Sequence, residues 1–252
     1  MDLDWATLRS TRVAYEDDGV LVLDKPAGIS VTGERHDTDL VVLAKAAGEW
    51  LMPAHRIDKV TSGLVLFAKS PAVHGPLTQQ FRDRTVDKAY LLITRSTGLP
   101  ERGTIDLPLS VGRKNRVRVA APRDAIVHDE MARRWSVPES EVRERSVAAT
   151  TTFERLWEGE QHTLLIARPR TGRRHQIRVH FAWIGHPIVG DPLFVSKDSE
   201  RAALHSWRLG FDATHSDGRR IDLQVDPAAD FWAPIEAYAS NLRDLIATIA
   251  SP

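Results

Sequence analysis

The chain lacks cysteine, net charge and long apolar runs. Without cysteine it can form no disulfide, no thiolate nucleophile and no cysteine-ligated zinc site. Lys plus Arg and Asp plus Glu both number 34, so a nucleic-acid site would need locally clustered basic residues. Chemistry by aspartate, histidine, serine or lysine remains possible.

Features of a membrane or secreted protein are also missing. No apolar run approaches the roughly 20 residues that a membrane-spanning helix needs. Residues 1–10 contain acids and a tryptophan where a signal peptide has a basic start and an apolar stretch. We therefore expect a cytoplasmic protein. The 252 residues, 42% of them apolar, are enough for a sizeable core, and we predict a single domain over 1–252.

The spacing of apolar residues predicts interleaved strands and helices. Short apolar or alternating runs bounded by Gly, Pro and Asp are typical of strands, whereas apolar residues three and four apart predict helices. Because no repeated unit occurs, we expect an α+β fold with a mixed, mostly antiparallel sheet and flanking helices. The predicted strands are 20–23, 64–68, 89–94, 148–156, 162–167, 203–211 and 221–225, and the predicted helices are 40–51, 77–82, 173–184 and 236–249.

Residues 112–146 have a different charge pattern from the rest of the chain. Basic residues lie close together at 113–118, and arginines then alternate with glutamates between 133 and 145. We therefore expect a mobile insertion over 112–146.

Three segments carry candidate chemistry: residues 55–64 (HRIDKVTSGL), the strand around Tyr90, and residues 171–180 (TGRRHQIRVH). Asp58 lies in a polar loop just before a predicted core strand. Taken singly, a loop carboxylate beside basic residues is most often a solvated surface acid, and an arginine-rich helix start is usually a solvated or phosphate-facing surface. Tyr90 alone could be a sheet tyrosine with its hydroxyl at the rim of the core.

Together, the segments resemble a known family. Residues 55–64 resemble the His-Arg-Leu-Asp and Thr-Ser-Gly-Leu signature of pseudouridine synthases related to the ribosomal large-subunit enzyme RluA, and residues 171–180 resemble their Gly-Arg-x-His-Gln-Ile-Arg-x-His motif. The resemblance covers about residues 14–246. It implies the pseudouridine synthase catalytic fold with a catalytic cleft, and the isomerisation of specific uridines in structured RNA, either ribosomal or transfer RNA.

The resemblance also implies catalytic residues. Asp58 matches the catalytic aspartate, Arg178 its ion-pair partner, and Tyr90 the ring that stacks on the target base. Isomerisation breaks the N1–C1′ bond, rotates the uracil and joins C5 to C1′, so the base must leave its stack and be held. The carboxylate must be ionised to attack C1′ or to remove a sugar proton, and an adjacent guanidinium lowers the pKa of a carboxyl group.

Further residues are expected to contact the RNA or to support the site. The resemblance implies that Arg56 helps to displace the nucleotide. We expect Arg56, Arg173 and Arg174 to meet phosphates, which position RNA without reading its sequence. His55 and His175 are expected to form hydrogen bonds that brace the site loops next to the RNA.

The chain departs from the family pattern in places that spare these groups. Asp24 stands where Asn is usual, Ile57 where Leu is usual, and residues 194–195 are Phe-Val instead of Tyr-Gly. We expect the first strand to begin near residue 13, and therefore expect a form without the N-terminal S4-like RNA-binding domain of many relatives. The basic part of 112–146 is one candidate for holding RNA, and a solvated variable loop is an equally good interpretation.

Three competing interpretations can be distinguished by their chemistry. A non-catalytic RNA-binding or RNA-folding protein would keep the fold without isomerisation. A hydrolase would pair Asp58 with a second carboxylate such as Asp191 and release free uracil. A histidine metal site would need ligand spacing such as His-Glu-x-x-His, which does not occur in the sequence. We expect no metal, no organic cofactor, no obligate protein partner and a monomer.

Overall fold

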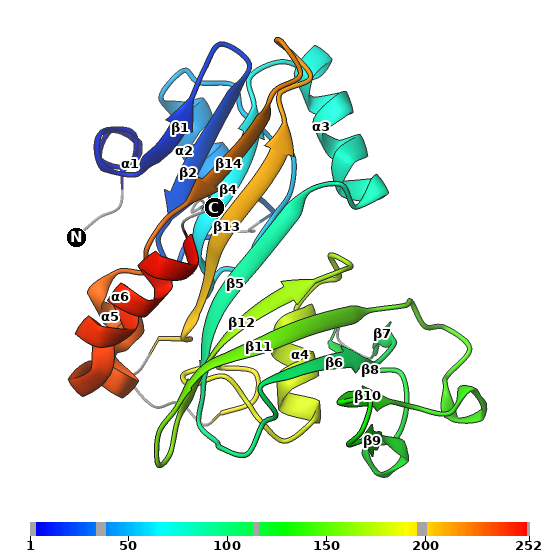
Figure 1. Ribbon diagram of the computed structural model, residues 1–252. Helices are drawn as coiled ribbons and strands as arrows, with labels where there is room; N and C mark the ends of the chain where they lie inside the picture. The colour runs from blue at the N-terminus through cyan, green and yellow to red at the C-terminus, as the bar shows by residue number, and fades with distance from the viewer. Residues whose placement is uncertain (1–3, 34–38, 113–115, 196–200, 251–252) are drawn as a thin grey trace. The chain divides into compact units, whose positions relative to one another are not determined.

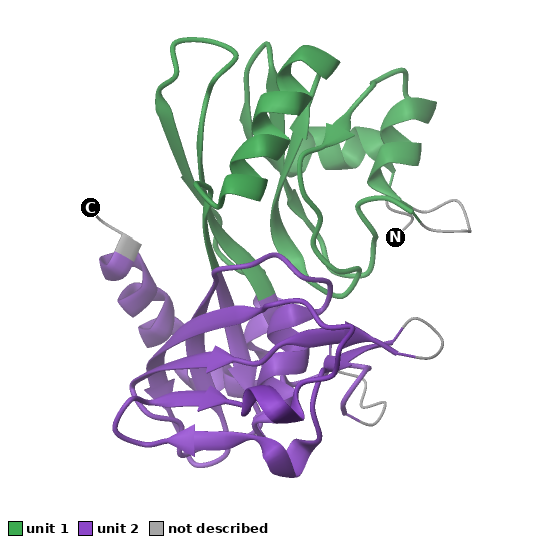
Figure 2. Ribbon diagram, turned by 90° about the vertical axis from the view of Figure 1, so that its right-hand side faces the viewer, with its two compact units in different colours: residues 1–89, 205–228 green, residues 90–204, 229–252 purple. Residues whose placement is uncertain are grey.

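The computed structural model describes residues 4–33, 39–112, 116–195 and 201–250. The chain forms two compact units, coloured separately in Figure 2: unit 1 is Met1–Ala89 with His205–Ala228, and unit 2 is Tyr90–Leu204 with Ala229–Pro252. The chain passes from one unit to the other within strands β5 (Asp87–Thr94) and β13 (Leu204–Asp212), and again between Ala228 and Ala229. That both units together form one catalytic domain stays a prediction.

Unit 1 is built on a sheet with the strand order β1-β2-β4-β13, to which β14 and β3 add at β13 and β4. Strand β4 is buried at every position, because β2 and β13 flank it and helix α3 packs on it. Its residues Leu64 and Leu66 share a core with Leu77 of α3 and Phe211 of β13. The elements of unit 1 in Figure 1 are α1 (Trp5–Thr11), β1 (Val13–Glu16), β2 (Val20–Lys25), α2 (Leu40–Ala46), β3 (Met52–Pro53), β4 (Ser62–Ala68), α3 (Pro71–Asp83) and β14 (Arg220–Gln224).

Two helices of unit 1 differ in length from the sequence prediction. Helix α2 ends at Ala46 instead of 51, since Gly48 follows in the left-handed region with φ +86°. Helix α3 begins at Pro71 instead of 77, with the Ser70 hydroxyl accepting from Val73 N. Pro suits the first turn because its missing N–H has no intrahelical partner there.

Unit 2 contains a sheet with the strand order β5-β12-β11-β6-β10-β9, and β7 pairs with β8 in a separate two-stranded sheet. Helix α4 packs on β11 through Phe181, whose ring centroid lies 5.6 Å from that of Phe153. The remaining elements are β6 (Arg102–Asp106), β7 (Leu109–Val111), β8 (Val117–Val119), η2 (Arg123–Ala125), β9 (Val127–Asp129), β10 (Arg134–Ser136), η3 (Glu139–Glu141), β11 (Thr150–Glu158), β12 (Thr163–Pro169), α4 (Gln176–Trp183), α5 (Ala229–Trp232), η4 (Ala233–Tyr238) and α6 (Ala239–Ala250).

The predicted insertion over 112–146 contributes to this sheet. Its strand β10 pairs in parallel with β6 and antiparallel with β9. Trp135 of β10 is 7% exposed, stacks on His128 at 4.0 Å, and lies 5.8 Å from the Phe153 ring. Residues 113–115, which include two of the basic residues, lie outside the described residues. Mobility of the segment stays a prediction, but its described part includes core contacts.

The α+β prediction is confirmed. Most described strand pairs are antiparallel, whereas β4 with β13 and β6 with β10 are parallel. Helix α4 begins after a turn that contains the buried Thr171. Among the described helices, none is both long and apolar enough to cross a membrane.

Candidate active site

The predicted site residues belong to both units. His55, Arg56 and Asp58 lie in unit 1, whereas Tyr90 and residues 173–178 lie in unit 2. Asp58 is partly buried in the loop that joins β3 to β4, and its backbone carbonyl accepts from Thr61 N at 3.0 Å. Arg56 in the same loop is exposed. The prediction that Asp58 lies in a loop just before a core strand is confirmed.

A buried lysine holds the Asp58 loop from one side. The Lys25 side chain, fully buried at the end of β2, donates to Pro26 O at 2.9 Å, Ile29 O at 2.7 Å and Lys59 O at 3.3 Å. Gly28 N donates to the same Lys59 carbonyl at 2.7 Å. Burying an ammonium group is costly unless its protons are bonded, and these carbonyls provide acceptors. Sequence reasoning did not predict this role for Lys25.

The other side of the loop is fixed where β4 meets β13. His205 Nε2 lies 2.9 Å from Val225 O, which can only accept, so Nε2 carries a proton. In the neutral ring, Nδ1 then accepts from the Ser62 hydroxyl at 2.8 Å. Gly63 has φ +104°, and a Cβ there would lie 2.2 Å from Ser206 O. The Ser-Gly pair of the motif therefore allows β4 and β13 to approach closely just after Asp58.

His55 braces the loop from within unit 1. Its ring stacks on Phe81 with centroids 4.7 Å apart, and Nε2 accepts from Leu66 N at 3.1 Å. Burial, with a smaller contribution from the charge of Lys88, lowers the pKa of His55 to about 3. The imidazole is therefore neutral at physiological pH and acts here as an acceptor. A direct contact between His55 and RNA stays a prediction.

In unit 2, the arginine-rich motif forms a tight turn before helix α4. The buried Gln176 side chain accepts from the Thr171 hydroxyl at 2.6 Å and from Arg173 N at 3.0 Å. It also donates to Thr150 O and to the Thr151 hydroxyl, both at 3.0 Å on β11. Gln176 thus fixes the turn to the sheet.

The predicted start of this helix at residue 173 is wrong. Helix α4 begins at Gln176, because His175 has left-handed backbone angles, φ 57° and ψ 16°. Arg173 and Arg174 consequently lie in the preceding turn, where Arg173 is exposed and Arg174 is partly buried. Arg174 therefore does not share a helical face with Arg178.

Arg178 is held by a carboxylate that follows α4. Its Nε donates to Asp191 Oδ2 at 2.8 Å and its Nη2 to Asp191 Oδ1 at 2.6 Å. The side chain of Arg178 is 5% exposed and that of Asp191 is fully buried. The sequence indicated Asp191 only as a possible second carboxylate of a hydrolase. That Arg178 also pairs with Asp58 stays a prediction.

Tyr90 lies on strand β5 and is 9% exposed. It pairs with Ala167 in the antiparallel ladder between β5 and β12. The predicted strand is confirmed, whereas base stacking by Tyr90 stays a prediction. Within the described ranges, no group of three or more His, Asp or Glu side chains could hold a metal ion.

Comparison with known proteins identifies the family. The profile of RNA pseudouridylate synthases matches residues 19–183, which include Asp58, Tyr90 and Arg178. The chain belongs to the RNA pseudouridylate synthase family. This synthase is 35% identical over 209 residues to the dual-specificity RNA pseudouridine synthase RluA of Vibrio vulnificus, covering 80% of this chain and 77% of that protein.

Two further relatives extend the match. Identity to the ribosomal large subunit pseudouridine synthase D of Nitrosomonas europaea is 31% over 250 residues, covering 92% of this chain and 66% of that protein. The solved structure of human RNA pseudouridylate synthase domain containing 4 has a TM-score of 0.71 at 23% identity, covering 90% of this chain and 92% of that one. The family prediction is confirmed: the protein is a synthase that isomerises uridine to pseudouridine in RNA.

Proposed function

We propose that this synthase acts as a cytoplasmic monomer on ribosomal or transfer RNA, with Asp58 as its catalytic carboxylate. Tyr90 stacks on the displaced uracil, and Arg178 pairs with Asp58. The ribosomal large subunit named for the Nitrosomonas relative supports an RNA of this class. The fixed geometry of the Asp58 loop is the observation that carries the assignment.

That loop has the properties that a catalytic group needs. Asp58 is partly buried, and so remains accessible, while Lys25 and the Ser62–His205 pair hold its neighbours on either side. Catalysis depends on holding the reacting group in a fixed position, and supporting hydrogen bonds supply that rigidity. A carboxylate that served only as a solvated surface group would not need buried side chains to fix its loop.

The proposed chemistry conserves every atom of the nucleotide. Asp58, as a carboxylate, attacks C1′ or removes a proton from the adjacent sugar carbon, and the N1–C1′ bond breaks. The uracil rotates and C5 joins C1′; in the first route this breaks the Asp58–C1′ bond, and in the second the proton returns from Asp58 to the sugar carbon. C5 then loses its proton to solvent, and N1 gains one. Tyr90 supplies a flat surface for the base while it is detached.

RNA binding is assigned to arginines at the borders of the site. Arg56 and Arg173 are exposed, and Arg174 is partly buried. Guanidinium groups bind phosphate oxygens through charge-assisted hydrogen bonds, which position a strand without reading its sequence. We assign these three residues to the phosphates on either side of the target uridine.

The substrate can be found by mapping pseudouridines in total RNA from cells with and without this gene. We expect one or more positions in ribosomal or transfer RNA to revert to uridine in the deletion. The wild-type gene should restore them and Asp58→Asn should not. An unchanged map, or full restoration by Asp58→Asn, would contradict the proposal.

A further inference from the structure

The Arg178–Asp191 pair is more deeply buried than an ordinary surface ion pair. Asp191 is fully buried, and both of its oxygens accept from Arg178. Its Oδ1 also accepts from Leu193 N at 2.9 Å. A buried charge is tolerated when it is paired and hydrogen-bonded in this way. A buried ion pair often adds little to the stability of the fold, so its presence is weak evidence for a purely stabilising role.

The geometry of the pair fixes the rotation of the guanidinium group. Asp191 engages Nε and Nη2, which form one edge of the planar group, and the Nη1 end therefore points away from Asp191. A bidentate contact sets both the position and the plane of an arginine side chain. Lysine, which presents a point charge, could not be oriented in this way.

Asp191 is itself attached to the strand that carries Tyr90. It lies in a turn where Phe194 N and Val195 N donate to its backbone carbonyl at 3.1 and 2.9 Å. Val189, two residues earlier, donates its N–H to Ile93 O of β5 at 2.9 Å. The carboxylate therefore ties Arg178 of helix α4 to β5 through a short, hydrogen-bonded turn.

We propose that Asp191 is a positioning residue for the isomerisation, which orients the Arg178 guanidinium relative to strand β5. This inference rests on the proposed role of Arg178 in the reaction. It also gives Asp191 a function other than that of a second catalytic carboxylate. Both Asp191 oxygens accept from N–H donors, so the group is unsuited to proton transfer.

The test is Asp191→Asn, which keeps the shape of the side chain but replaces one acceptor oxygen with a donor NH₂. We expect the single-turnover rate constant for pseudouridine formation to fall about 10- to 100-fold, as for other small misplacements of an active-site group. RNA affinity and the near-ultraviolet circular dichroism at the assay temperature should match the wild type. A rate constant equal to that of the wild type would overturn the proposal.

A double-mutant cycle separates positioning from an independent role. In an Arg178→Lys background the guanidinium edge that Asp191 orients is absent. Asp191→Asn should therefore have little further effect on the rate constant. If the fold-reductions in the rate constant caused by the two substitutions multiply in the double variant, the residues act independently and the proposal is overturned. Activity of the wild type and its loss in Asp58→Asn test the proposed function separately, so the inference can fail while that function stands.

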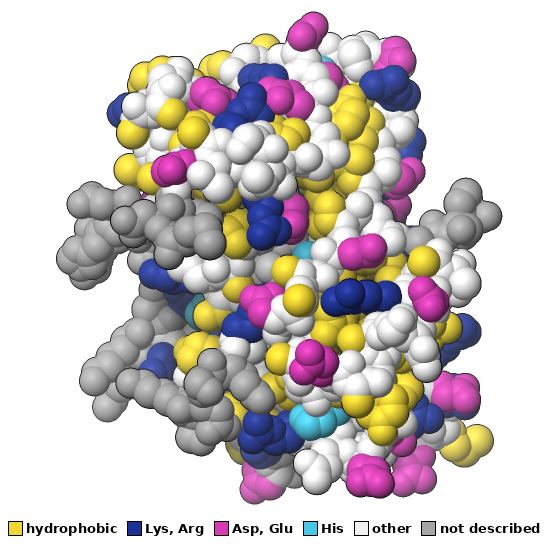
Figure 3. Space-filling model, turned by 90° about the vertical axis from the view of Figure 1, so that its left-hand side faces the viewer, with side chains coloured by type: hydrophobic (Ala, Val, Ile, Leu, Met, Phe, Trp, Pro, Cys, Tyr) yellow, Lys and Arg dark blue, Asp and Glu magenta, His cyan; other side chains and the backbone are white. Residues whose placement is uncertain are grey.

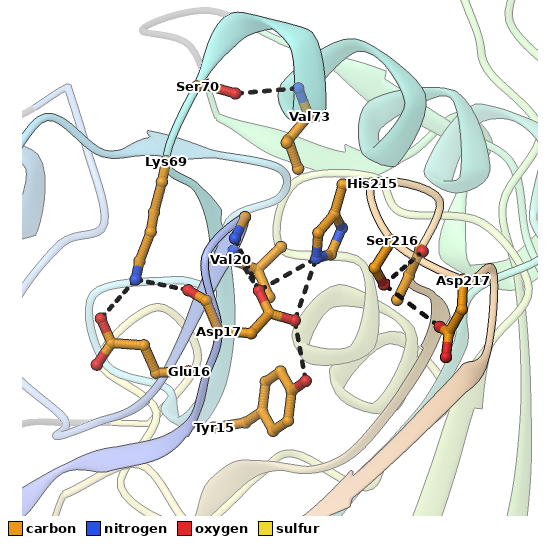
Figure 4. A network of polar contacts seen from close by, with 12 residues as sticks. Tyr15, Glu16, Asp17, Val20, Lys69, Ser70, Val73, His215, Ser216 and Asp217 are labelled. Atoms are coloured by element: carbon orange, nitrogen blue, oxygen red, sulfur yellow. Dashed lines mark hydrogen bonds and ion pairs between the residues drawn. The ribbon is translucent and has the colours of Figure 1, made fainter.

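Asp17→Asn is a matched control in unit 1. Figure 4 shows the Asp17 carboxylate beside His215, whose Nε2 lies 3.1 Å from both Asp17 oxygens; Asp17 also accepts from Gly19 N and Val20 N at 2.9 Å. Asp17 precedes β2, and Lys25 lies at the other end of this strand, about 17 Å from its first residue, Val20. The control should lower stability and leave the single-turnover rate constant unchanged.

A measurement on the wild type covers the case in which Asp191→Asn folds poorly. A bidentate pair prevents rotation about the Nε–Cζ bond, so the N–H groups of Arg178 should give separate, slowly exchanging NMR signals. The signals would be assigned to Arg178 by their disappearance from the spectrum of Arg178→Lys. Averaged signals from a freely rotating guanidinium group would overturn the proposal.

Discussion

The aromatic ring of Tyr90 provides a test of base capture at the scale of one residue. Tyr90→Phe should preserve stacking and most RNA affinity. Tyr90→Leu should weaken capture of the displaced uracil by about 1–3 kcal/mol, the usual range for losing an aromatic stacking partner. Competition binding with substrate RNA measures the difference. Equal losses in the two variants would assign the role to the hydroxyl group instead.

Gly63 is a second position where a single atom decides the outcome. Gly63→Ala should reduce the free energy of unfolding by more than about 3 kcal/mol, because its Cβ would lie 2.2 Å from Ser206 O. Gly48 also has a positive φ but no atom within 4 Å, so Gly48→Ala should cost about 1–2 kcal/mol through backbone strain alone. Urea unfolding compares the two, and equal losses would show that the close contact is unimportant.

The sequence predicted residues that carry chemistry better than the residues that support them. Asp58, Tyr90 and Arg178 stand in long motifs with a recognisable order. The supporting groups depend on contacts between distant segments: Ser62 and His205 are 143 residues apart, and Lys25 bonds to Lys59 across 34. A buried lysine or histidine has no sequence pattern that distinguishes it from a surface one.

At the scale of elements, His180 makes the attachment of helix α4 sensitive to pH. It is fully buried, with Nδ1 2.9 Å from the Thr151 hydroxyl and Nε2 3.0 Å from Leu107 O. Burial lowers its pKa from 6.5 to about 4. Between these values the unfolded chain binds a proton that the folded protein does not, so stability is full above about pH 6.5 and falls as the pH drops towards 4.

His180→Gln should therefore flatten the dependence of stability on pH. Urea unfolding at pH 7 and pH 5 should show a loss for the wild type that is about 2 kcal/mol larger than the loss for the variant. His55, with its pKa lowered to about 3, contributes in the same direction in both proteins. Identical pH dependence in the two proteins would mean that His180 is not a buried neutral group.

The boundaries of helices show where local sequence reasoning stops. The strand that contains Tyr90 and the strand after Asp58 were predicted because their apolar runs are short and bounded by polar residues. The start of α4 was not predicted, because His175 adopts a left-handed conformation. The side chain of Gln176, which bonds to Thr150 and Thr151, stabilises this turn. Such tertiary bonds override the periodicity of a motif.

At the scale of the whole molecule, zero net charge requires that RNA affinity come from particular residues. On the face shown in Figure 3, basic and acidic side chains are interspersed. Arg56→Gln should reduce the slope of log affinity against log salt concentration by about 0.7–0.9, the value for one lost phosphate contact. Arg102 is 73% exposed and pairs with Glu154, so Arg102→Gln should leave the slope unchanged.

Filter binding of substrate RNA at several salt concentrations measures both slopes. The same slope for Arg56→Gln and the wild type would remove Arg56 from the phosphate contacts.

The fold class could be predicted because interleaved strands and helices leave few packing arrangements. The role of 112–146 could not be predicted, since its attachment to the sheet depends on tertiary contacts such as the pairing of β10 with β6 and the contact of Trp135 with Phe153.

The most direct test of the catalytic assignment is tritium release from RNA labelled with [5-³H]uridine in cells that lack the gene. Joining C5 to C1′ expels the hydrogen at C5, so the wild type should release tritium into water, whereas unlabelled RNA should be converted without a change in mass. Asp58→Asn should remain folded and release essentially none, since it keeps the side-chain shape and loses the charge. Release by Asp58→Asn within about tenfold of the wild-type rate, or free uracil in place of pseudouridine, would contradict the account.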